Sequence, residues 1–332
     1  MSNVTLVTGG AGFIGSHLVD DLVKAGQTVR VLDDFSTGLR GNLNHHGTGI
    51  DVVDGSLTDP AAVERATKGV RTIYHLGALA SVARSVETPA VSHAACATGT
   101  VLLLDAARKS GVKRVVYAAS SSAYGGSTGD GGQTEDQLPA ARSPYAAAKL
   151  AGELYMQAFA ATYGLETVRV RFFNIFGPRQ RSDSPYSGVI ALFIAAMARG
   201  EVPTVHGDGL QSRDFTFVAN AVQALRKAAD ADASVASGNV YNVGTGRSVT
   251  VLDLVNALNN ILGKKLSPTF VPTRAGDVRF SRADITRTRR DLGYDPTVTF
   301  EDGLRQTVQW HLEQKTDKVP VNSVGNKRAV RV

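Results

Sequence analysis

The sequence has little cysteine and no long uninterrupted apolar stretch. Its single cysteine, Cys96, excludes an internal disulfide and cannot build a zinc site by itself, so we predict no metal. No apolar run approaches the ~18 residues of a membrane-spanning helix, and the strongly apolar stretch Val189 to Met197 is too short. The N-terminal residues have the pattern of a strand and not of a targeting segment. We therefore predict a cytoplasmic protein with no membrane partner.

Stacking aromatics are missing from the two segments that hold much of the positive charge. The chain has 36 Lys and Arg against 30 Asp and Glu, a net charge of +6. Much of the excess lies in residues 274–290 and in the tail 315–332, and neither segment interleaves its charges with a series of aromatic side chains. Modules that bind single-stranded nucleic acid combine both features. The pattern favours phosphate-binding arginines and a solvated tail, so we expect no nucleic acid partner.

The rest of the composition is that of an ordinary globular protein. Hydrophobic residues make up 43% and charged residues 20% of the 332 positions. A chain of this length has room for about two domains. No internal repeat or low-complexity segment interrupts the sequence.

The stretch Val4 to Gly15, VTLVTGGAGFIG, predicts a strand, a tight turn and a helix. An apolar β-branched run breaks into glycines and restarts as an amphipathic segment from Phe13 to Leu22. Gly12 and Gly15 fit a glycine fingerprint whether it is counted from Gly9 or from the next residue. Such glycines let the backbone turn sharply and approach a pyrophosphate, which then faces the helix N-terminus.

An acidic residue follows the second predicted strand at the distance that a dinucleotide fingerprint requires. Residues Thr28 to Leu32 are apolar and β-branched, and Asp33 comes about 20 residues after the glycines. A carboxylate there accepts hydrogen bonds from a ribose 2′-hydroxyl and repels a 2′-phosphate, which favours NAD over NADP. The alternative is that Asp33 and Asp34 only begin a surface turn.

Strand and helix patterns alternate along the first half of the chain and predict a parallel sheet covered on both faces. Strands are predicted at 50–53, 72–75, 112–119 and 166–172, and helices at 60–68, 91–109 and 144–163. The predicted fold class is α/β, a Rossmann-type doubly wound parallel sheet, with an NAD-binding domain over residues 1–176.

From Gly177 the elements become shorter and predict a smaller, interleaved α/β substrate domain over 177–312. Helices are predicted at 189–198, 219–228 and 251–262, and short strands at 215–217, 240–243 and 266–271. Segments near 214–245 are expected to return to the first domain, and residues 313–332 to form a flexible basic tail. The second domain should cover the carboxyl ends of the sheet, where ligands of open α/β sheets bind.

Hydroxyl, phenol and ammonium groups lie at chemically useful spacings. The strand at 112–119 continues into Ser120, Ser121 and Ser122, and a later helix places Tyr145 and Lys149 one turn apart. An ammonium and a cationic nicotinamide both favour the phenolate form of a tyrosine, which can then take a proton from an alcohol. The alternative for the last two residues is an ordinary exposed helix pair.

Taken together, these motifs resemble the extended short-chain dehydrogenase/reductases of the NAD-dependent epimerase/dehydratase family. The likeness covers about residues 3 to 312 and is greatest to the UDP-glucose and UDP-N-acetylglucosamine 4-epimerases. It rests on the glycine loop, the acid after the second strand, the serines before Tyr-Gly and the Tyr-x-x-x-Lys pair. Further matching motifs are RFFNIFGPRQ (171–180), SPYSGVI (184–190), HGDGLQSRDFTFV (206–218), YNVGTG (241–246) and RAGDVRFSRAD (274–284).

The resemblance implies a tightly held NAD that is reduced and reoxidised within one turnover of a UDP-sugar. Tyr145 would deprotonate the C4 hydroxyl, Lys149 would bridge the nicotinamide ribose, and Ser120, with Ser121 as the alternate, would orient the oxygen. The implied cofactor contacts are Gly9, Gly12, Phe13, Ile14, Gly15, Asp33, Asp34, Ser36, Thr37, Gly38, Ser56, Leu57, Leu76, Ala78, Thr98, Tyr145 and Lys149. The implied substrate contacts are Ser122, Asn174, Arg181, Arg213, Arg274, Asp277 and Ser281.

Three positions bear on the substrate. The resemblance places Ser281 beside the sugar C2 group, where a small residue admits an N-acetyl substituent. Related dehydratases carry an Asp-Glu pair where this chain has Ser121-Ser122, which disfavours dehydration. Arg181 resembles a residue of UDP-glucuronate 4-epimerases, and a guanidinium there could pair with a C6 carboxylate. A UDP-glucuronate 4-epimerase or decarboxylase is therefore the alternative, and a non-catalytic NAD sensor the distant one.

The chain also departs from the family pattern at two cofactor positions. Ser56 stands where many relatives have an aspartate near the adenine, and Thr98 where some have an asparagine by the nicotinamide. His75 and Cys96 are given structural roles. The helices at 91–109 and 145–163 correspond to those through which family members dimerise, so a homodimer is expected.

Overall fold

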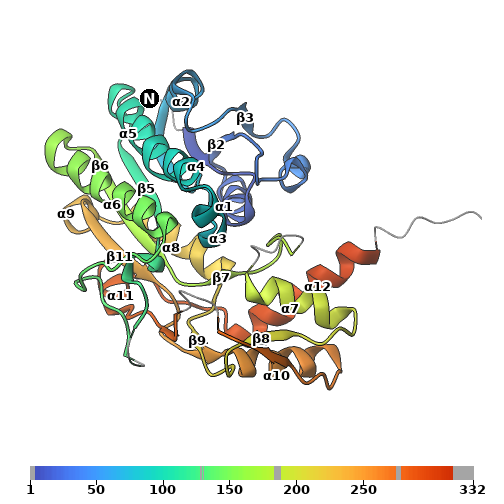
Figure 1. Cartoon of the computed structure of the whole chain (residues 1–332). Coiled ribbons are helices and arrows are strands. Elements are labelled where there is room, and N and C mark those ends of the chain that lie inside the picture. The colour runs from blue at the N-terminus through green and yellow to red at the C-terminus, as the bar shows by residue number, and fades with distance from the viewer. Residues whose placement is uncertain (1–3, 128, 130, 183–187, 274–277, 317–332) are drawn as a thin grey trace, which may run out of the picture.

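The structure is a computed structural model that describes residues 4–127, 129, 131–182, 188–273 and 278–316 (Figure 1). Two predicted substrate contacts, Arg274 and Asp277, and the predicted tail from residue 317 onward lie outside the described residues.

A seven-stranded, wholly parallel sheet forms the larger layer, in the order β11-β6-β5-β4-β1-β2-β3. Its strands are β1 Val4–Thr8, β2 Thr28–Asp33, β3 Asp51–Asp54, β4 Val70–His75, β5 Arg114–Ser120, β6 Glu166–Phe172 and β11 Asn239–Val243. The chain starts in the middle, moves to one edge and then returns to build the other half, so the order reverses between β1 and β4. This arrangement confirms the predicted doubly wound Rossmann-type fold.

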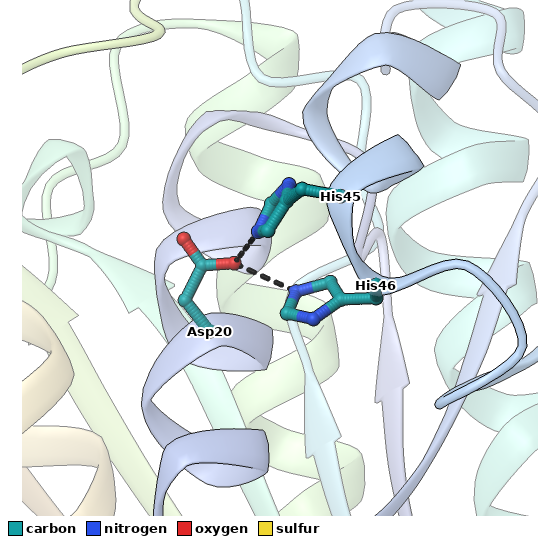
Figure 2. Close-up of side chains that lie close together, drawn as sticks. All are labelled: Asp20, His45 and His46. Atoms are coloured by element: carbon teal, nitrogen blue, oxygen red, sulfur yellow. Dashed lines mark hydrogen bonds and ion pairs between the residues drawn. The ribbon is translucent and has the colours of Figure 1, made fainter.

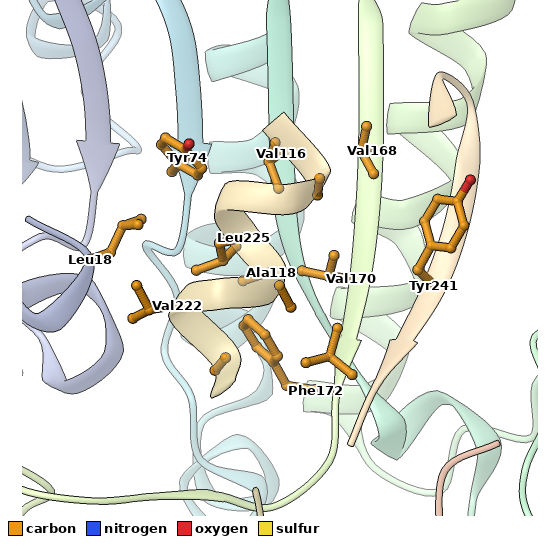
Figure 3. Packing of buried hydrophobic residues seen from close by; sticks show 14 of the residues in the cluster. Leu18, Tyr74, Val116, Ala118, Val168, Val170, Phe172, Val222, Leu225 and Tyr241 are labelled. Atoms are coloured by element: carbon orange, nitrogen blue, oxygen red, sulfur yellow. The ribbon is translucent and has the colours of Figure 1, made fainter. Parts of the chain in front are cut away.

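Alternate side chains of the strands supply two separate cores, one on each face of the sheet. On β5, Val116 and Ala118 join the core under α1 (Phe13–Lys24) and α8 (Val218–Asp230), which Figure 3 shows. Val115 and Tyr117 point to the opposite face, under α2 (Pro60–Thr67), α5 (Gly99–Lys109) and α6 (Pro144–Tyr163). Because both faces are covered, the strands read as near-continuous apolar runs.

The helix predicted at 91–109 begins earlier and changes its pitch. It follows α3 (Val82–Glu87) and consists of α4 (Pro89–His93), a π-helical turn (Ala94–Thr98) and α5. The continuous helix Pro89–Lys109 is long and apolar enough to cross a membrane by length and composition. The sequence did not predict this, because polar residues interrupt its apolar stretches. Half of its apolar window is buried inside the fold, as in the core helix of a globular protein.

The second half of the chain builds a smaller layer below the carboxyl ends of the strands (Figure 1). Its core joins α7 (Val189–Ala198), α10 (Val251–Leu262) and α12 (Phe300–Thr316) around a cluster of phenylalanines. Short strands brace it: β7 Ile175–Phe176 with β10 Thr216–Phe217, β8 Thr204–His206 with β13 Thr269–Val271, and β9 Ser212–Arg213 with β12 Val249–Thr250 and β14 Phe280–Ser281.

Several parts of this half differ from the sequence-based prediction, among them the strands β8, β9, β12 and β14, which it did not include. Helix α8 and strand β11 do return to the large sheet, but α11 (Thr286–Leu292) packs beside β11 as well. Strand β13 starts at Thr269 and not at residue 266. Helix α12 ends at Thr316, so the first four residues of the predicted tail are helical. The chain therefore crosses between the two layers more often than the hydrophobic pattern indicates.

A buried ion pair ties α6 to β6. The Glu153 carboxylate accepts three contacts from the Arg171 guanidinium at 3.0, 3.1 and 2.7 Å. The Glu153 side chain is 1% exposed and the Arg171 side chain 5% exposed. A pair this deep contributes little net stability, but removing one partner leaves the other charge buried and uncompensated.

We predict that Glu153→Ala lowers the free energy of unfolding by about 3–5 kcal/mol, because it leaves the Arg171 guanidinium without its carboxylate. Urea unfolding followed by circular dichroism measures this change. The matched control is Asp105→Ala on α5, which removes an ion pair with Arg108 and Lys109 at the surface and should change stability by less than about 1 kcal/mol. Equal losses in the two variants would contradict the account.

Candidate active site

The turn after β1 has the backbone that the glycine fingerprint predicts. Gly9 adopts a positive φ of 69°, and the Gly12 N–H donates to the Gly9 carbonyl at 3.1 Å. A Cβ on Gly15 would lie 2.1 Å from that same carbonyl oxygen, so α1 can lie this close only with glycine there. Helix α1 starts after Gly12 with no side-chain cap, which leaves its first N–H groups available to a phosphate.

The loop after β4 packs directly on this turn. A Cβ on Gly9 would come within 2.8 Å of the Gly77 Cα, and the Gly77 N–H donates to the Thr8 hydroxyl at 3.1 Å. Leu57 lies against the same loop, since a Cβ on Gly77 would be 2.5 Å from its Cδ1. These contacts place the loops after β1, β3 and β4 together at the point where the strand order reverses, which is where doubly wound sheets bind ligands.

Asp33 ends β2 and holds the glycine turn. One carboxylate oxygen accepts the Ala11 N–H at 2.9 Å, and the other accepts the Phe35 N–H at 2.9 Å. Asp34 caps the following turn by accepting the Ser36 N–H at 2.9 Å. Burial raises the pKa of Asp33, and the two backbone donors oppose that rise. Each carboxylate oxygen retains a lone pair for a ribose hydroxyl, so the residues fit the adenosine end of a dinucleotide.

The predicted hydroxyl, phenol and ammonium groups come together at the end of β5. Ser120 lies close enough to the side chain of Tyr145 to lower the pKa of the phenol. The Ser120 Oγ also accepts the Ser122 N–H at 3.2 Å and the Ser122 hydroxyl at 2.9 Å. Lys149 lies one turn further along α6 and is 2% exposed. Ser121, the predicted alternate, is half-buried in the short turn Ser121–Tyr124.

Burial controls the protonation of this group. It raises the pKa of Tyr145, while the hydrogen bond from Ser120 acts in the opposite direction. Burial lowers the pKa of Lys149 to about 8, against the opposing effects of Cys96 and Glu153. Burial therefore favours the phenol form of Tyr145. A phenolate at neutral pH requires the charge of the Lys149 ammonium together with further positive charge nearby.

The start of α6 fixes where Tyr145 stands. Ser143 caps the helix by accepting the Ala146 N–H at 3.1 Å, and Pro144 occupies the first helical position. The Tyr145 N–H donates to the hydroxyl of the fully buried Ser85 at 3.1 Å. The sequence analysis missed Ser85, because a lone serine sixty residues away carries no local signal for this contact.

In the smaller layer, three of the predicted substrate residues lie on or next to short paired strands. Arg213 on β9 is in register with Ser281 on β14, and Ser281 is 8% exposed. Asn174 follows β6 with a positive φ of 38° and lies with its Nδ2 3.5 Å from the Asp214 carbonyl. These three residues therefore share one wall.

A buried carboxylate next to Arg213 joins this wall together, and the sequence analysis did not identify it. Asp214 is 0% exposed and accepts the N–H of Thr245 at 2.8 Å, of Gly246 at 2.9 Å and of Ala283 at 3.1 Å, and the Thr245 hydroxyl at 2.7 Å. Burial raises the pKa of Asp214, and these donors oppose the rise. One side chain thus connects three of the recognised motifs.

Comparisons with known proteins agree with this geometry. Residues 5–244 match the NAD dependent epimerase/dehydratase family. The chain belongs to that family. It is 37% identical to the UDP-glucose 4-epimerase of Mycolicibacterium smegmatis, over 92% of this chain and 97% of the relative. It is also 32% identical to a UDP-N-acetyl-alpha-D-glucosaminuronate decarboxylase of Bacillus cytotoxicus, over 96% of this chain and 100% of the relative.

A solved structure shows the same likeness in three dimensions. The crystal structure of UDP-glucose 4-epimerase from Thermotoga maritima with UDP-glucose superimposes with a TM-score of 0.89 at 37% identity, covering 94% of this chain and 99% of the other. Family membership makes the protein an NAD-dependent enzyme. The relatives differ in reaction, so membership alone does not select one.

Arg181 lies next to the loop that follows β2. Its side chain is exposed, and its Nη1 is 3.5 Å from the Thr37 carbonyl, on the loop that follows Asp33. This contact places Arg181 beside the predicted ribose loop. The family resemblance predicts a substrate contact there, and that remains a prediction.

Asp20, His45 and His46 form a side-chain cluster between α1 and the loop after β2 (Figure 2). Both imidazole Nε2 atoms lie 2.8 Å from one Asp20 oxygen, and the Arg179 guanidinium lies 2.7 Å from the other. Among the described residues, only these three offer converging metal-type ligand atoms. The guanidinium already neutralises Asp20, and hydrogen bonds account for the cluster. It fastens the loop after β2 and the start of the second layer to α1.

We predict that Asp33→Asn weakens NAD binding and lowers the preference for NAD over NADP by about tenfold or more, because an amide cannot repel the 2′-phosphate. Fluorescence titration of cofactor-free protein with each dinucleotide measures both affinities. Asp54→Asn at the end of β3, which removes the same charge from an exposed position, serves as the control. An unchanged ratio of the two affinities in Asp33→Asn would overturn the assignment.

Proposed function

We propose that this enzyme catalyses the NAD-dependent 4-epimerisation of a UDP-hexose, with Tyr145 as the base. The substrates would be UDP-glucose and UDP-galactose, and also their N-acetylated counterparts. The observation that carries the proposal is the position of Ser120 next to Tyr145, one helical turn from Lys149, at the carboxyl ends of the parallel strands where the glycine turn also lies. The similarity to UDP-glucose 4-epimerases supports it.

NAD, which the glycine turn and Asp33 would hold, would supply reversible hydride transfer at C4 of the sugar, and return of the hydride to the opposite face would invert the configuration. Tyr145 would take the proton of the C4 hydroxyl and later give it back, so one residue serves as base and then as acid. A positioned group of this kind contributes about 10²–10⁴-fold to the rate. Lys149, as an ammonium, stabilises the phenolate that the first step requires.

Ser120 is arranged to donate a hydrogen bond. Its Oγ already accepts two hydrogen bonds from Ser122, so its own O–H is left to point at Tyr145 or at the sugar oxygen. A donor aimed at this oxygen favours the charged form of Tyr145 and polarises the substrate carbonyl that forms at C4. Ser122 thereby acts through Ser120.

The nucleotide end of the substrate would bind along the wall that Asp214 organises. Arg213 would pair with the diphosphate and Asn174 would hydrogen-bond to the UDP group, with Arg274 and Asp277 completing the site as the resemblance implies. NAD would be retained between turnovers by the uncapped start of α1 and by Asp33.

Exposed apolar side chains on two helices support a homodimer. Val91 is 54%, Leu154 59% and Tyr155 45% exposed, and these residues lie on the helix Pro89–Lys109 and on α6, which pack against each other. A second copy of the chain would cover this apolar surface. The same two helices carry Cys96 and Tyr145, so the dimer would also stiffen the active site.

A UDP-sugar with a C6 carboxylate is the second candidate substrate. The similarity to a UDP-N-acetylglucosaminuronate decarboxylase favours it, and Arg181 is the residue that could pair with the acid. If Arg181 selects acidic sugars, Arg181→Ala removes activity on UDP-glucuronate and spares activity on UDP-glucose. Proton NMR of the anomeric signals with each sugar distinguishes the two candidates.

We predict that Tyr145→Phe lowers kcat for UDP-glucose epimerisation by about 10²–10⁴-fold and leaves bound NAD in place, because only the proton acceptor is lost. Anomeric proton NMR gives the rate, and absorbance of the released cofactor gives the NAD content. Tyr163→Phe at the exposed end of the same helix is the control and should keep full activity. Undiminished activity in Tyr145→Phe would refute the proposed base.

We also predict that Ser281→Tyr lowers kcat/KM for UDP-N-acetylglucosamine relative to UDP-glucose by about tenfold or more, because a bulky ring would occupy the space of the N-acetyl group. Competition between the two sugars in one NMR tube measures the ratio directly. A ratio that stays at the wild-type value would show that Ser281 does not face C2 of the sugar.

A further inference from the structure

The ammonium of Lys149 is buried without an ion-pair partner. The residue is 2% exposed, and none of the carboxylates within 4–127, 129, 131–182, 188–273 and 278–316 forms a salt bridge with it. Glu153, the acid one turn further along α6, is held by Arg171 through three contacts. A buried charge without compensation is unfavourable, so another group must stabilise it.

The ring of Tyr117 supplies that stabilisation. The Lys149 Nζ lies over the ring face, 4.1 Å from its centroid, which is the geometry of a cation–π contact. The Tyr117 hydroxyl donates to the backbone carbonyl of Lys149 at 3.2 Å. Gly152 makes room for this hydroxyl, because a Cβ there would lie 2.3 Å from the Tyr117 oxygen. Tyr117 thus contacts both the charge and the backbone of the same lysine.

A neutral histidine packs against Tyr117. The His75 ring lies with its centroid 5.3 Å from that of Tyr117 and is fully buried. The Thr100 hydroxyl donates to the Cys96 carbonyl at 2.6 Å, so it accepts from His75 Nε2 at 2.9 Å. His75 Nδ1 then accepts the Thr8 hydroxyl at 2.8 Å.

These hydrogen bonds and the burial of His75 favour its neutral form, so that His75 adds no second positive charge near Lys149. Burial, with a smaller effect from the Lys149 charge, lowers the pKa of His75 to about 3, so the imidazole is neutral at physiological pH. The Tyr117 ring packs against the His75 imidazole, and its hydroxyl is hydrogen-bonded to the backbone of α6. Because Thr8 ends β1 and also accepts from Gly77, the contact chain from the glycine turn to Lys149 is continuous.

We propose that Tyr117 is a positioning residue of this enzyme, which holds the Lys149 ammonium through its ring face and so keeps the lysine charged beside Tyr145. The inference rests on the proposed function, because only the role of Lys149 in that reaction gives its charge a purpose. It assigns a task to a fully buried strand residue that is not among the predicted cofactor and substrate contacts.

The other charged or titratable groups around Lys149 come from three elements. Cys96 lies in the π-helical turn, Glu153 and Tyr145 on α6, and His75 at the end of β4. Burial is the main influence on the Lys149 pKa, and Cys96 and Glu153 raise it. Since a ring face stabilises only the ammonium form, weakening it should lower the Lys149 pKa further and leave the surroundings unchanged.

The test replaces Tyr117 by phenylalanine and then by phenylalanines with one, two and three ring fluorines, incorporated at this single position. Fluorine withdraws charge from the ring face and weakens cation–π attraction while the shape is kept. The series therefore separates the charge effect from packing. Thermal unfolding of each holoenzyme checks that the fold is intact. Tyr117→Phe keeps the ring face, so its pH profile should be nearly that of the wild type.

We expect the alkaline limb of the kcat profile, which reports loss of the Lys149 proton, to move to lower pH with each fluorine. The total shift should be about one pH unit. The acid limb should stay in place, because the ring acts on the lysine and not on the proton of Tyr145. The same fluorinated residues at Phe159, a buried position on α6, should leave both limbs unchanged. An alkaline limb that is insensitive to fluorination would overturn the proposal.

A second readout does not depend on catalysis. In protein labelled with 13C at the lysine ε-carbon, the Lys149 signal, assigned with Lys149→Arg, should titrate at lower pH in the trifluorinated variant than in Tyr117→Phe. A lower midpoint for the Lys149 signal in a protein without epimerase activity would contradict the proposed function but support the contact between Tyr117 and Lys149. Equal midpoints in an active enzyme would contradict the contact and keep the function.

Discussion

The close approach of two backbones at the centre of the sheet is the constraint on which the site depends. The turn after β1 and the loop after β4 meet at Gly9 and Gly77, and a Cβ on Gly9 would come 2.8 Å from the facing Cα. This contact brings two neighbouring, parallel strand ends to one place and leaves the first turn of α1 uncapped beside them. The helix end that is predicted to bind phosphate and the loop that follows β4 are therefore built from one junction.

From this junction the contacts lead outward in two directions. On one side, Asp33 fastens the glycine turn to the end of β2. On the other side, Thr8 contacts His75, His75 packs on Tyr117, and Tyr117 supports Lys149 beside Tyr145. The buried charges along these routes differ in one respect. Glu153 has an ionic partner in Arg171, whereas the Lys149 ammonium has the ring face of Tyr117.

The features carried by local patterns could be predicted from the sequence. The glycine turn, Asp33, the serines after β5 and the Tyr145–Lys149 spacing each depend on residues within one strand–turn–helix unit or one helix. The bounds of α6 were predicted to the residue because Pro144 at the first helical position and Gly164 after the last turn mark its two ends.

The features that depend on long-range contacts could not be predicted. Ser85 reaches the Tyr145 backbone across sixty residues, and Asp214 joins three motifs through donors 31 to 69 residues away. Nothing near these residues in the sequence marks them, since an isolated serine or aspartate fits many surface positions. The return of α11 to the large sheet was missed for the same reason. The role of Tyr117 was hidden in a strand whose interior, Val115 to Ala119, is entirely apolar or aromatic.

The central claim is that the reaction at C4 is an oxidation followed by a reduction within one enzyme. Its most direct test uses UDP-glucose with deuterium at C4, incubated in ordinary water with the enzyme as purified. The account predicts UDP-galactose that retains the deuterium at C4 with its configuration inverted, because the hydride leaves and returns without meeting solvent. Loss of the deuterium to water would contradict it, since it would show that C4 gives up a proton and not a hydride.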